Sequence, residues 1–130
     1  MTGGVLHQLW AAVTTAMASW HQGKLFVEHA VSISHDTLHL IFGVLIWLGV
    51  ALLSRRPLTS WTPWLWVLAF ILWNEVADLW NEHWPDAGQQ YGEGAKDVAL
   101  TMLVPTVLMF AARARPDLFR AVPSRRSRRR

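Results

Sequence analysis

The sequence predicts an all-α membrane protein with three transmembrane helices and an N-terminal interfacial amphipathic helix. Hydrophobic residues make up 52% of the 130 residues, and nine residues are tryptophan, which is high for a small soluble protein. Three apolar runs stand out, at 38–53, at 64–73 with an amphipathic continuation to 84, and at 98–112. With its flanking turn, each approaches the roughly 17–25 residues that a span needs. The length indicates one domain, divided into an interfacial segment (1–34), a transmembrane bundle (35–113) and a basic tail (114–130).

The N-terminal segment has the pattern of an amphipathic helix over residues 5–20. Val5, Leu9, Val13, Ala16 and Trp20 fall on one arc and polar side chains on the other. This pattern favours a helix that lies in the membrane interface over a fourth span. We expect Gln22 and Gly23 to break it, with a second short, partly apolar piece at 24–33. No basic stretch followed by an apolar core and a small-residue cleavage site is visible, so we expect no cleaved signal peptide.

The first two spans have recognisable ends. Ser34 is a suitable N-cap for the first span, with Asp36 in its first turn, and residues 55–57 (Arg-Arg-Pro) end it. Thr62 and Pro63 are expected to cap and start the second span, and Pro85 to end it.

The third span is expected after a loop at 86–94, which contains three glycines and shows no periodicity. Within this span, Pro105 should kink the helix and leave the carbonyl of Thr101 without its intrahelical donor. The chain has no cysteine, so it has no disulfide and no thiolate metal site.

The charges predict the orientation. Arg55 and Arg56 lie between the first two spans, and eight further arginines follow the third span. Two crossings separate these groups, so both lie on one face, which the positive-inside rule makes the cytoplasmic face of a bacterial inner membrane. Eight of the nine acids belong to the opposite half: Glu28, Asp36, Glu75, Asp78, Glu82, Asp86, Glu93 and Asp97. We expect the arginine tail to contact anionic lipid head groups, and we expect no nucleic-acid partner.

The outer ends of the three spans carry the candidate site residues. They are His35 and His39 on the first span, Glu75, Asp78 and Glu82 on the second, and Lys96, Asp97 and Thr101 on the third. A bundle would gather them into one outward-facing polar cavity. Glu82, with His83 and Asp86, also fits a purely solvated rim. Glu75 lies roughly 18 Å into its helix. We expect Glu75 and Asp78 to have a partner inside the bundle, for which Lys96 is the expected counter-ion.

Crowded carboxylates suit a proton acceptor or a general acid, and they also suit a divalent cation. His35 and His39 are one helical turn apart, as metal ligands often are. No Glu-x-x-His or His-Glu-x-x-His motif is present, however, so we assign no metal site and no cofactor from the sequence. The chain has no glycine-rich phosphate loop and no serine nucleophile elbow. No catalytic residue is therefore assigned, and whether the protein is an enzyme stays open.

Three motifs resemble those of the VanZ-like membrane proteins. Asp36-x-x-His39-x-x-x-Gly43 is similar to the opening Asp-x-x-His-x-x-x-Gly pattern of that family. Glu75-x-x-Asp78 falls where the family has Glu-x-x-Gln. Residues 97–105, with Asp97, Thr101 and Pro105, fall where it has Asp-x-x-x-Asn-x-x-x-Gly. Asp78, Thr101 and Pro105 depart from the pattern, and the family's arginine before the Asp has no counterpart. The resemblance implies a role in the cell envelope, as in tolerance of glycopeptides directed at the cell wall.

A second resemblance is to the small bacterial diacylglycerol and undecaprenol kinases. Asn74-x-x-x-Asp78-x-x-x-Glu82 and the later Ala-Lys96-Asp97 are similar to their active-site stretch, although Glu and Asp stand in reverse order. Those proteins also have three spans and an amphipathic N-terminal helix, and their acids bind Mg-ATP. The predicted orientation places this cluster outside, away from cytoplasmic ATP.

The sequence thus favours a protein that binds or processes an envelope lipid or lipid-linked intermediate at the outer leaflet. An alternative from another class is a non-catalytic accessory subunit of a larger membrane complex, or a homo-oligomer, that packs through Trp73, Trp80 and Trp84. These tryptophans also fit a belt facing lipid.

Overall fold

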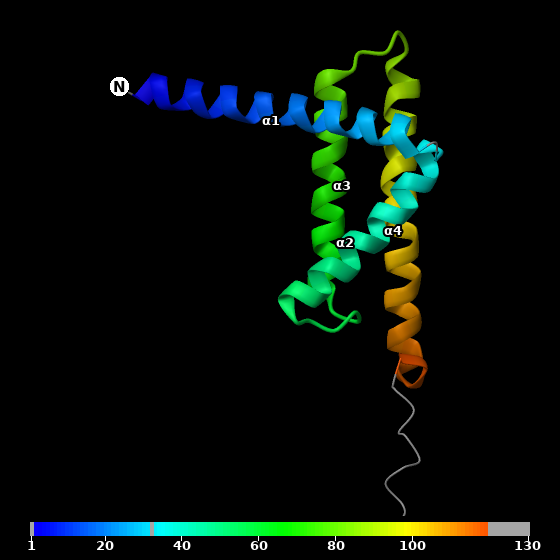
Figure 1. Cartoon of the computed structure of the whole chain (residues 1–130). Helices are drawn as coiled ribbons and strands as arrows, with labels where there is room; N and C mark the ends of the chain where they lie inside the picture. Colours follow the sequence, from blue (N-terminus) through cyan, green and yellow to red (C-terminus); the bar gives the residue numbers. More distant parts are fainter. Residues whose placement is uncertain (1, 32, 120–130) are drawn as a thin grey trace, which may run out of the picture.

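The computed structural model describes residues 2–31 and 33–119, which form four α-helices and one short 3-10 helix. The elements are α1 (Thr2–Val31), α2 (His35–Ser54), α3 (Trp61–Asn81), α4 (Ala87–Ala114) and η1 (Pro116–Phe119) (Figure 1). No strand occurs in these ranges, which confirms the all-α fold. The expected arginine tail beyond residue 119 lies outside the described residues.

The last three α-helices form a bundle that α1 crosses at one end. In Figure 1, α3 and α4 stand side by side and antiparallel, and α2 runs diagonally against them. α1 lies crosswise over the end of the bundle where α2 begins, α3 ends and α4 begins, and it contacts α3. All the ends that carry the candidate site residues therefore meet under one helix.

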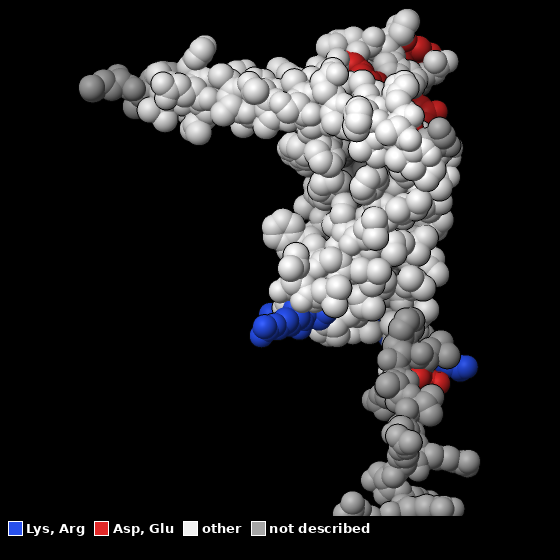
Figure 2. All heavy atoms as spheres, viewed as in Figure 1, with Lys and Arg blue, Asp and Glu red and all other residues white. Residues whose placement is uncertain are grey.

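Two of the helices, α2 and α4, are long and apolar enough to cross a membrane. α3 is not among them, although three spans were expected, because its last third carries Asn74, Glu75 and Asp78. On the face shown in Figure 2, most acidic side chains gather at the end near α1, and Lys and Arg gather at the opposite end, with some acidic atoms beside them. The surface between the two ends carries no charge in that view.

The predicted ends of α2 are confirmed. The Ser34 hydroxyl accepts a hydrogen bond from the backbone N–H of Thr37 at 3.3 Å, as an N-cap does. Arg55 ends the helix in the left-handed conformation, with φ of 52°. The predicted start of α3 is two residues late, because Ser60 and not Thr62 is the N-cap. Its hydroxyl accepts from the N–H of Thr62 at 3.2 Å.

Two other sequence expectations about helix boundaries are wrong. α1 continues through Gln22 and Gly23 to Val31, since a glycine costs a helix only about 1 kcal/mol and the residues after it pack on the bundle. The expected loop at 86–94 is also helical from Ala87 onward. Asp86 caps this helix by accepting from the N–H groups of Gly88 and Gln89, so the residue expected to be only rim has a structural role.

A compact apolar core joins α2, α3 and α4. Its buried members are Trp47, Val67, Ile71, Met102 and Met109. The core lies on the basic side of the candidate site, so it fixes the spacing of the three helices whose acidic ends hold the polar residues.

α2 and α4 approach each other most closely at Gly43. A Cβ atom built on Gly43 would overlap the backbone carbonyl of Thr101, so only glycine fits this position. That carbonyl is the one whose intrahelical donor is removed by Pro105, which remains inside α4. The Cα–H of Gly43 thus lies against an oxygen that lacks its usual intrahelical donor.

Candidate functional site

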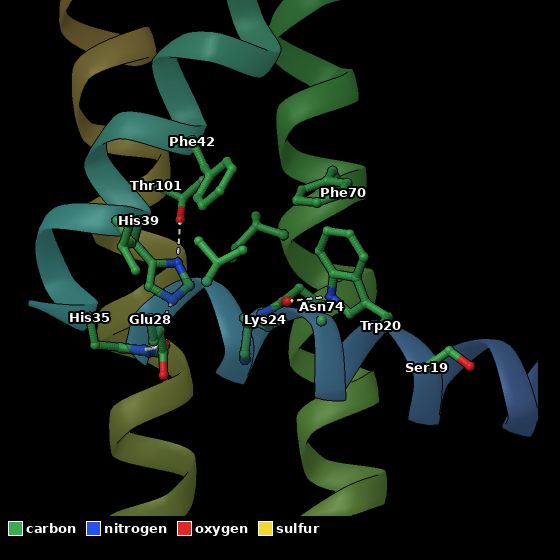
Figure 3. Close-up of a pocket in the computed structure, with 14 residues that line it drawn as sticks. Ser19, Trp20, Lys24, Glu28, His35, His39, Phe42, Phe70, Asn74 and Thr101 are labelled. Atoms are coloured by element: carbon green, nitrogen blue, oxygen red, sulfur yellow. Dashed lines mark hydrogen bonds and ion pairs between the residues drawn. The ribbon is translucent and has the colours of Figure 1, made fainter. Parts of the chain in front are cut away.

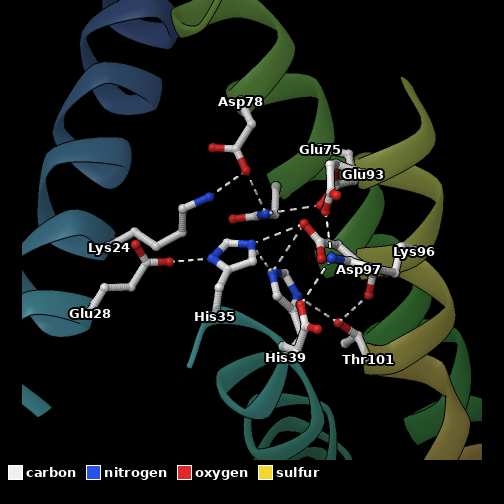
Figure 4. Close-up of polar contacts among 12 residues, drawn as sticks. Lys24, Glu28, His35, His39, Glu75, Asp78, Glu93, Lys96, Asp97 and Thr101 are labelled. Atoms are coloured by element: carbon white, nitrogen blue, oxygen red, sulfur yellow. Dashed lines mark hydrogen bonds and ion pairs between the residues drawn. The ribbon is translucent and has the colours of Figure 1, made fainter. Parts of the chain in front are cut away.

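The polar side chains meet where α1 crosses the end of the bundle at which α2 and α4 begin (Figure 4). α2 contributes His35 and His39 from its first two turns, and α4 contributes Asp97 and Thr101. Glu75 and Asp78 come from α3. α1 adds Lys24 and Glu28, so all four helices contribute to the site. This end of the bundle is held by the α1 contacts as well as by the apolar core.

Three of these residues form a compact triad, which we call the His–His–Asp cluster: His35, His39 and Asp97. The Nε2 atoms of the two histidines are 3.1 Å apart. Asp97 Oδ2 lies 3.0 Å from Nε2 of His35 and 3.5 Å from Nε2 of His39. His39 and Asp97 are buried. Three potential ligand atoms from two helices therefore converge on one point.

Two further residues fix the outer nitrogens of the histidines. Thr101 Oγ1 donates to the carbonyl of Asp97 at 2.8 Å, and since a hydroxyl has one proton, it must accept from Nδ1–H of His39 at 2.9 Å. His35 Nδ1 is bonded to the Glu28 carboxylate on α1. Both histidines thus carry a proton on Nδ1, and their Nε2 atoms face each other and Asp97.

A second group attaches α1 to α3. Lys24 forms an ion pair with Asp78, and Nδ2 of Asn74 donates to the same carboxylate at 3.0 Å. Asn74 in turn accepts from the indole N–H of Trp20 at 2.9 Å, and Nδ1 of His21 lies 3.3 Å from Asp78. The Asp78 carboxylate is therefore fully paired, with an ammonium group as its counter-ion.

Glu75 lies between the two groups and has no ion pair within residues 2–31 and 33–119. Its Oε1 accepts from Nδ2 of Asn74 at 3.2 Å. The other carboxylate oxygen lies close to Gly94, where a Cβ atom would come within 2.7 Å of it. The glycine that sequence analysis assigned to a loop thus makes room for this half-buried acid.

Lys96 and Glu82 lie at the rim of the site. The prediction that Lys96 is the counter-ion of Glu75 and Asp78 is wrong. Lys96 points outward, and its Nζ lies 3.1 Å from Asp36 and 2.5 Å from Glu93. Glu82 is the C-cap of α3, and its carboxylate lies 3.7 Å from Nδ1 of His21. Of the six other residues predicted from the sequence, three are buried (His39, Asp97 and Thr101) and three are partly exposed (His35, Glu75 and Asp78).

Two cavities border the cluster. The first, of about 380 Å³, lies between α1 and the bundle and is mostly apolar. Leu38, Phe42 and Phe70 line its walls, and His35, His39 and Thr101 lie at one end (Figure 3). The second, of about 300 Å³, is lined by charged residues that include Glu75, Asp78 and Asp97. His35 borders both cavities.

Sequence analysis missed the contribution of α1. Trp20, Lys24 and Glu28 are spaced by four residues, which places them on one face of a continuous helix. The sequence contains this spacing, but the helix break expected at Gly23 prevented the three residues from being assigned to one helical face.

The chain was compared with protein-family models, curated proteins and solved structures. No family model, no curated protein and no solved structure matches the chain. The function must therefore be argued from the site itself.

Proposed function

We propose that the protein is a small bacterial inner-membrane protein that binds an envelope lipid or lipid-linked intermediate between α1 and a three-span bundle. The observation that carries the proposal is the apolar cavity of about 380 Å³ that ends at His35 and His39. An apolar cavity with a few polar groups at one end suits an amphiphilic ligand. The alkyl chain would lie against Phe42 and Phe70, and the head group would face the His–His–Asp cluster.

The surface of the bundle supports a membrane location. Large apolar side chains are exposed on the outer faces of all three bundle helices: Leu45, Leu52, Leu65, Trp66, Val76, Leu103, Val107 and Phe110. A soluble monomer rarely exposes so much apolar surface. α3 has 21 residues and is about 31 Å long, which matches a hydrocarbon core of about 30 Å. Asn74 and Asp78 bond to α1 and Glu75 lies against Gly94 of α4, so the span would not expose these groups to lipid.

The position of α1 supports binding at the outer leaflet. α1 lies crosswise at the acidic end of the bundle, as an interfacial helix would, while Arg55, Arg56 and Arg113 lie at the other end. The positive-inside rule makes the arginine end cytoplasmic. The resemblance to VanZ-like proteins also favours a function in the cell envelope.

A second candidate function, that of an accessory subunit, rests on the first half of α1. This half extends beyond the bundle (Figure 1) and exposes apolar side chains such as Val5, Leu6 and Leu9. An amphipathic helix that overhangs in this way can bind a partner's helix as well as a lipid surface.

The topology can be tested with two reporters. A reporter active only in the cytoplasm should work when it is fused after residue 130, and one active only outside should work when it is inserted between Trp84 and Pro85. The reason is that the basic end of the bundle stays inside. The reverse result would place the carboxylates in the cytoplasm and favour the lipid-kinase alternative.

Lipid binding can be tested by filling the cavity. Gly23 lines the cavity, and a Cβ atom there would meet no atom within 4 Å, so Gly23→Leu can enter the space without displacing the fold. We expect this variant to lose about 10-fold in crosslinking to a long-chain fatty acid that carries a photoreactive diazirine, because the alkyl chain and the leucine compete for one volume.

The matched control is Gly4→Leu on the same helix, which also meets no atom within 4 Å and lies outside the cavity. It should be crosslinked as well as the unmodified protein. Equal labelling of both variants would mean that the probe binds elsewhere, and would contradict the proposal.

A further inference from the structure

The His–His–Asp cluster needs one positive charge at its centre. Thr101 and Glu28 hold the proton of each imidazole on Nδ1, so neutral histidines direct the lone pairs of two Nε2 atoms at each other and at the Asp97 carboxylate. Three lone pairs within 3.0–3.5 Å of one another repel unless a positive charge lies between them.

Neither nearby lysine supplies that charge within the part of the chain that the structure describes, because Lys24 is paired with Asp78, and Lys96 is paired with Asp36 and Glu93. The charge is therefore either a proton on Nε2 of His35, which lies 3.0 Å from Asp97, or a metal ion. A divalent cation in place of that proton would balance the two carboxylates of Asp97 and Glu28.

The spacing of the three atoms fits a metal ion. Ligands at about 2.0–2.1 Å from a zinc ion lie about 2.9 Å apart at right angles and about 3.4 Å apart in a tetrahedron. The observed separations of 3.0, 3.1 and 3.5 Å cover this range. The Asp97 side chain is only 8% exposed, and its other carboxylate oxygen, Oδ1, is buried and has no hydrogen-bond partner among the described residues. It is free to act as a further ligand.

We propose that His35, His39 and Asp97 bind a divalent transition-metal ion, with Zn²⁺ as the best match to two imidazoles and one carboxylate. Glu28 and Thr101 are the outer partners that orient the ligands, as carboxylates and hydroxyls do around histidine–metal sites. Three protein ligands leave an open position, and His35 and His39 border the apolar cavity. The site would therefore hold a water molecule or a ligand's oxygen at the end of that cavity.

The second cluster of ligand-type residues makes the contrast clear. His21, Asp78 and Glu82 also lie close enough together to hold an ion. In that cluster, however, the ammonium group of Lys24 already neutralises the Asp78 carboxylate. Metal binding is thus assigned to one cluster and not to the other.

The proposal goes beyond lipid binding and is tested separately from it. The full-length protein, purified in mild detergent and treated with a chelator, is titrated with Zn²⁺ and with Co²⁺. We expect one ion per chain and the visible absorption bands of four-coordinate or five-coordinate Co²⁺. The Gly23→Leu variant, which blocks the cavity, should still bind the ion, so the two proposals can fail independently.

Variants locate the site. His39→Gln should abolish binding, and His29→Gln, at an exposed histidine that bonds only to its own helix, should not change it. Since His39→Gln can also weaken the fold, Glu28→Gln provides a second measurement. It changes no ligand, and it should reduce the affinity about 10–100-fold with unchanged helical content.

Two results would overturn the proposal. A folded protein that gives no Co²⁺ spectrum would mean that a shared proton, and not a metal, holds the three groups together. Binding that persists unchanged in both His39→Gln and Glu28→Gln would mean that the ion binds at another position.

Discussion

Replacing Lys24 by Met should lower the free energy of unfolding by about 3–5 kcal/mol, which is the largest effect that we expect from a single substitution. Lys24 and Asp78 are each only 16% exposed, so the methionine leaves a carboxylate that is largely shielded from water and has lost its counter-ion. The side chains are similar in length, and the change therefore tests the charge. Thermal unfolding in detergent, followed by circular dichroism, measures the loss.

The control is the same substitution at Lys96. Its side chain is 42% exposed and its partners Asp36 and Glu93 remain hydrated, so the unfolding midpoint should hardly change. The double variant Lys24→Met/Asp78→Asn should recover part of the loss, because it removes the unpaired charge. Equal effects of Lys24→Met and Lys96→Met would show that the α1–α3 pair is solvated and does not hold α1 in place.

Gly43→Ala should destabilise the protein by about 1–3 kcal/mol, because the added methyl group would overlap the carbonyl of Thr101. The clashing atom belongs to the backbone, which cannot relieve the overlap by a change of rotamer as a side chain can. α2 must therefore move away from α4, and the movement also stretches the hydrogen bond between His39 and Thr101, one turn away.

Gly49 on the same helix is the matched control. No atom lies within 4 Å of a Cβ built there, so Gly49→Ala should stabilise the helix by about 0.5–1 kcal/mol. The two substitutions make the same chemical change, and their unfolding midpoints should move in opposite directions. A destabilised Gly49→Ala together with an unaffected Gly43→Ala would contradict the close approach of α2 to α4.

Local signals in the sequence were enough to predict most of the helices. Ser34 and Arg55 mark the ends of α2 because a cap depends on neighbouring residues only. Gly23 was wrongly taken as a break, and Gly94 as part of a loop. In both cases the structure places the glycine in a helix that is held by contacts with other helices, and such contacts are not visible in a local pattern.

The sequence predicted the level along the bundle at which the site residues lie, but it did not predict which of them form ion pairs. Counting residues from the helix ends indicated that His39, Glu75 and Asp97 lie at a similar level. Which acid pairs with which base depends on the rotation of each helix and on the path of α1. For this reason Lys24, and not Lys96, is the partner of Asp78.

The contact between α2 and α4 repeats along both helices with one constant offset. His35 meets Asp97, and His39 meets Thr101, each 62 residues further along the chain. Gly43, one turn further along α2, lies against the carbonyl of Thr101, whose intrahelical donor is missing because residue 105 is proline. Every step on either helix is four residues, so insertion or deletion of a single residue within 35–43 or 97–105 would turn part of one ridge by about 100°. Proteins that share this contact should therefore tolerate paired substitutions within the two ridges, but no insertion or deletion in either.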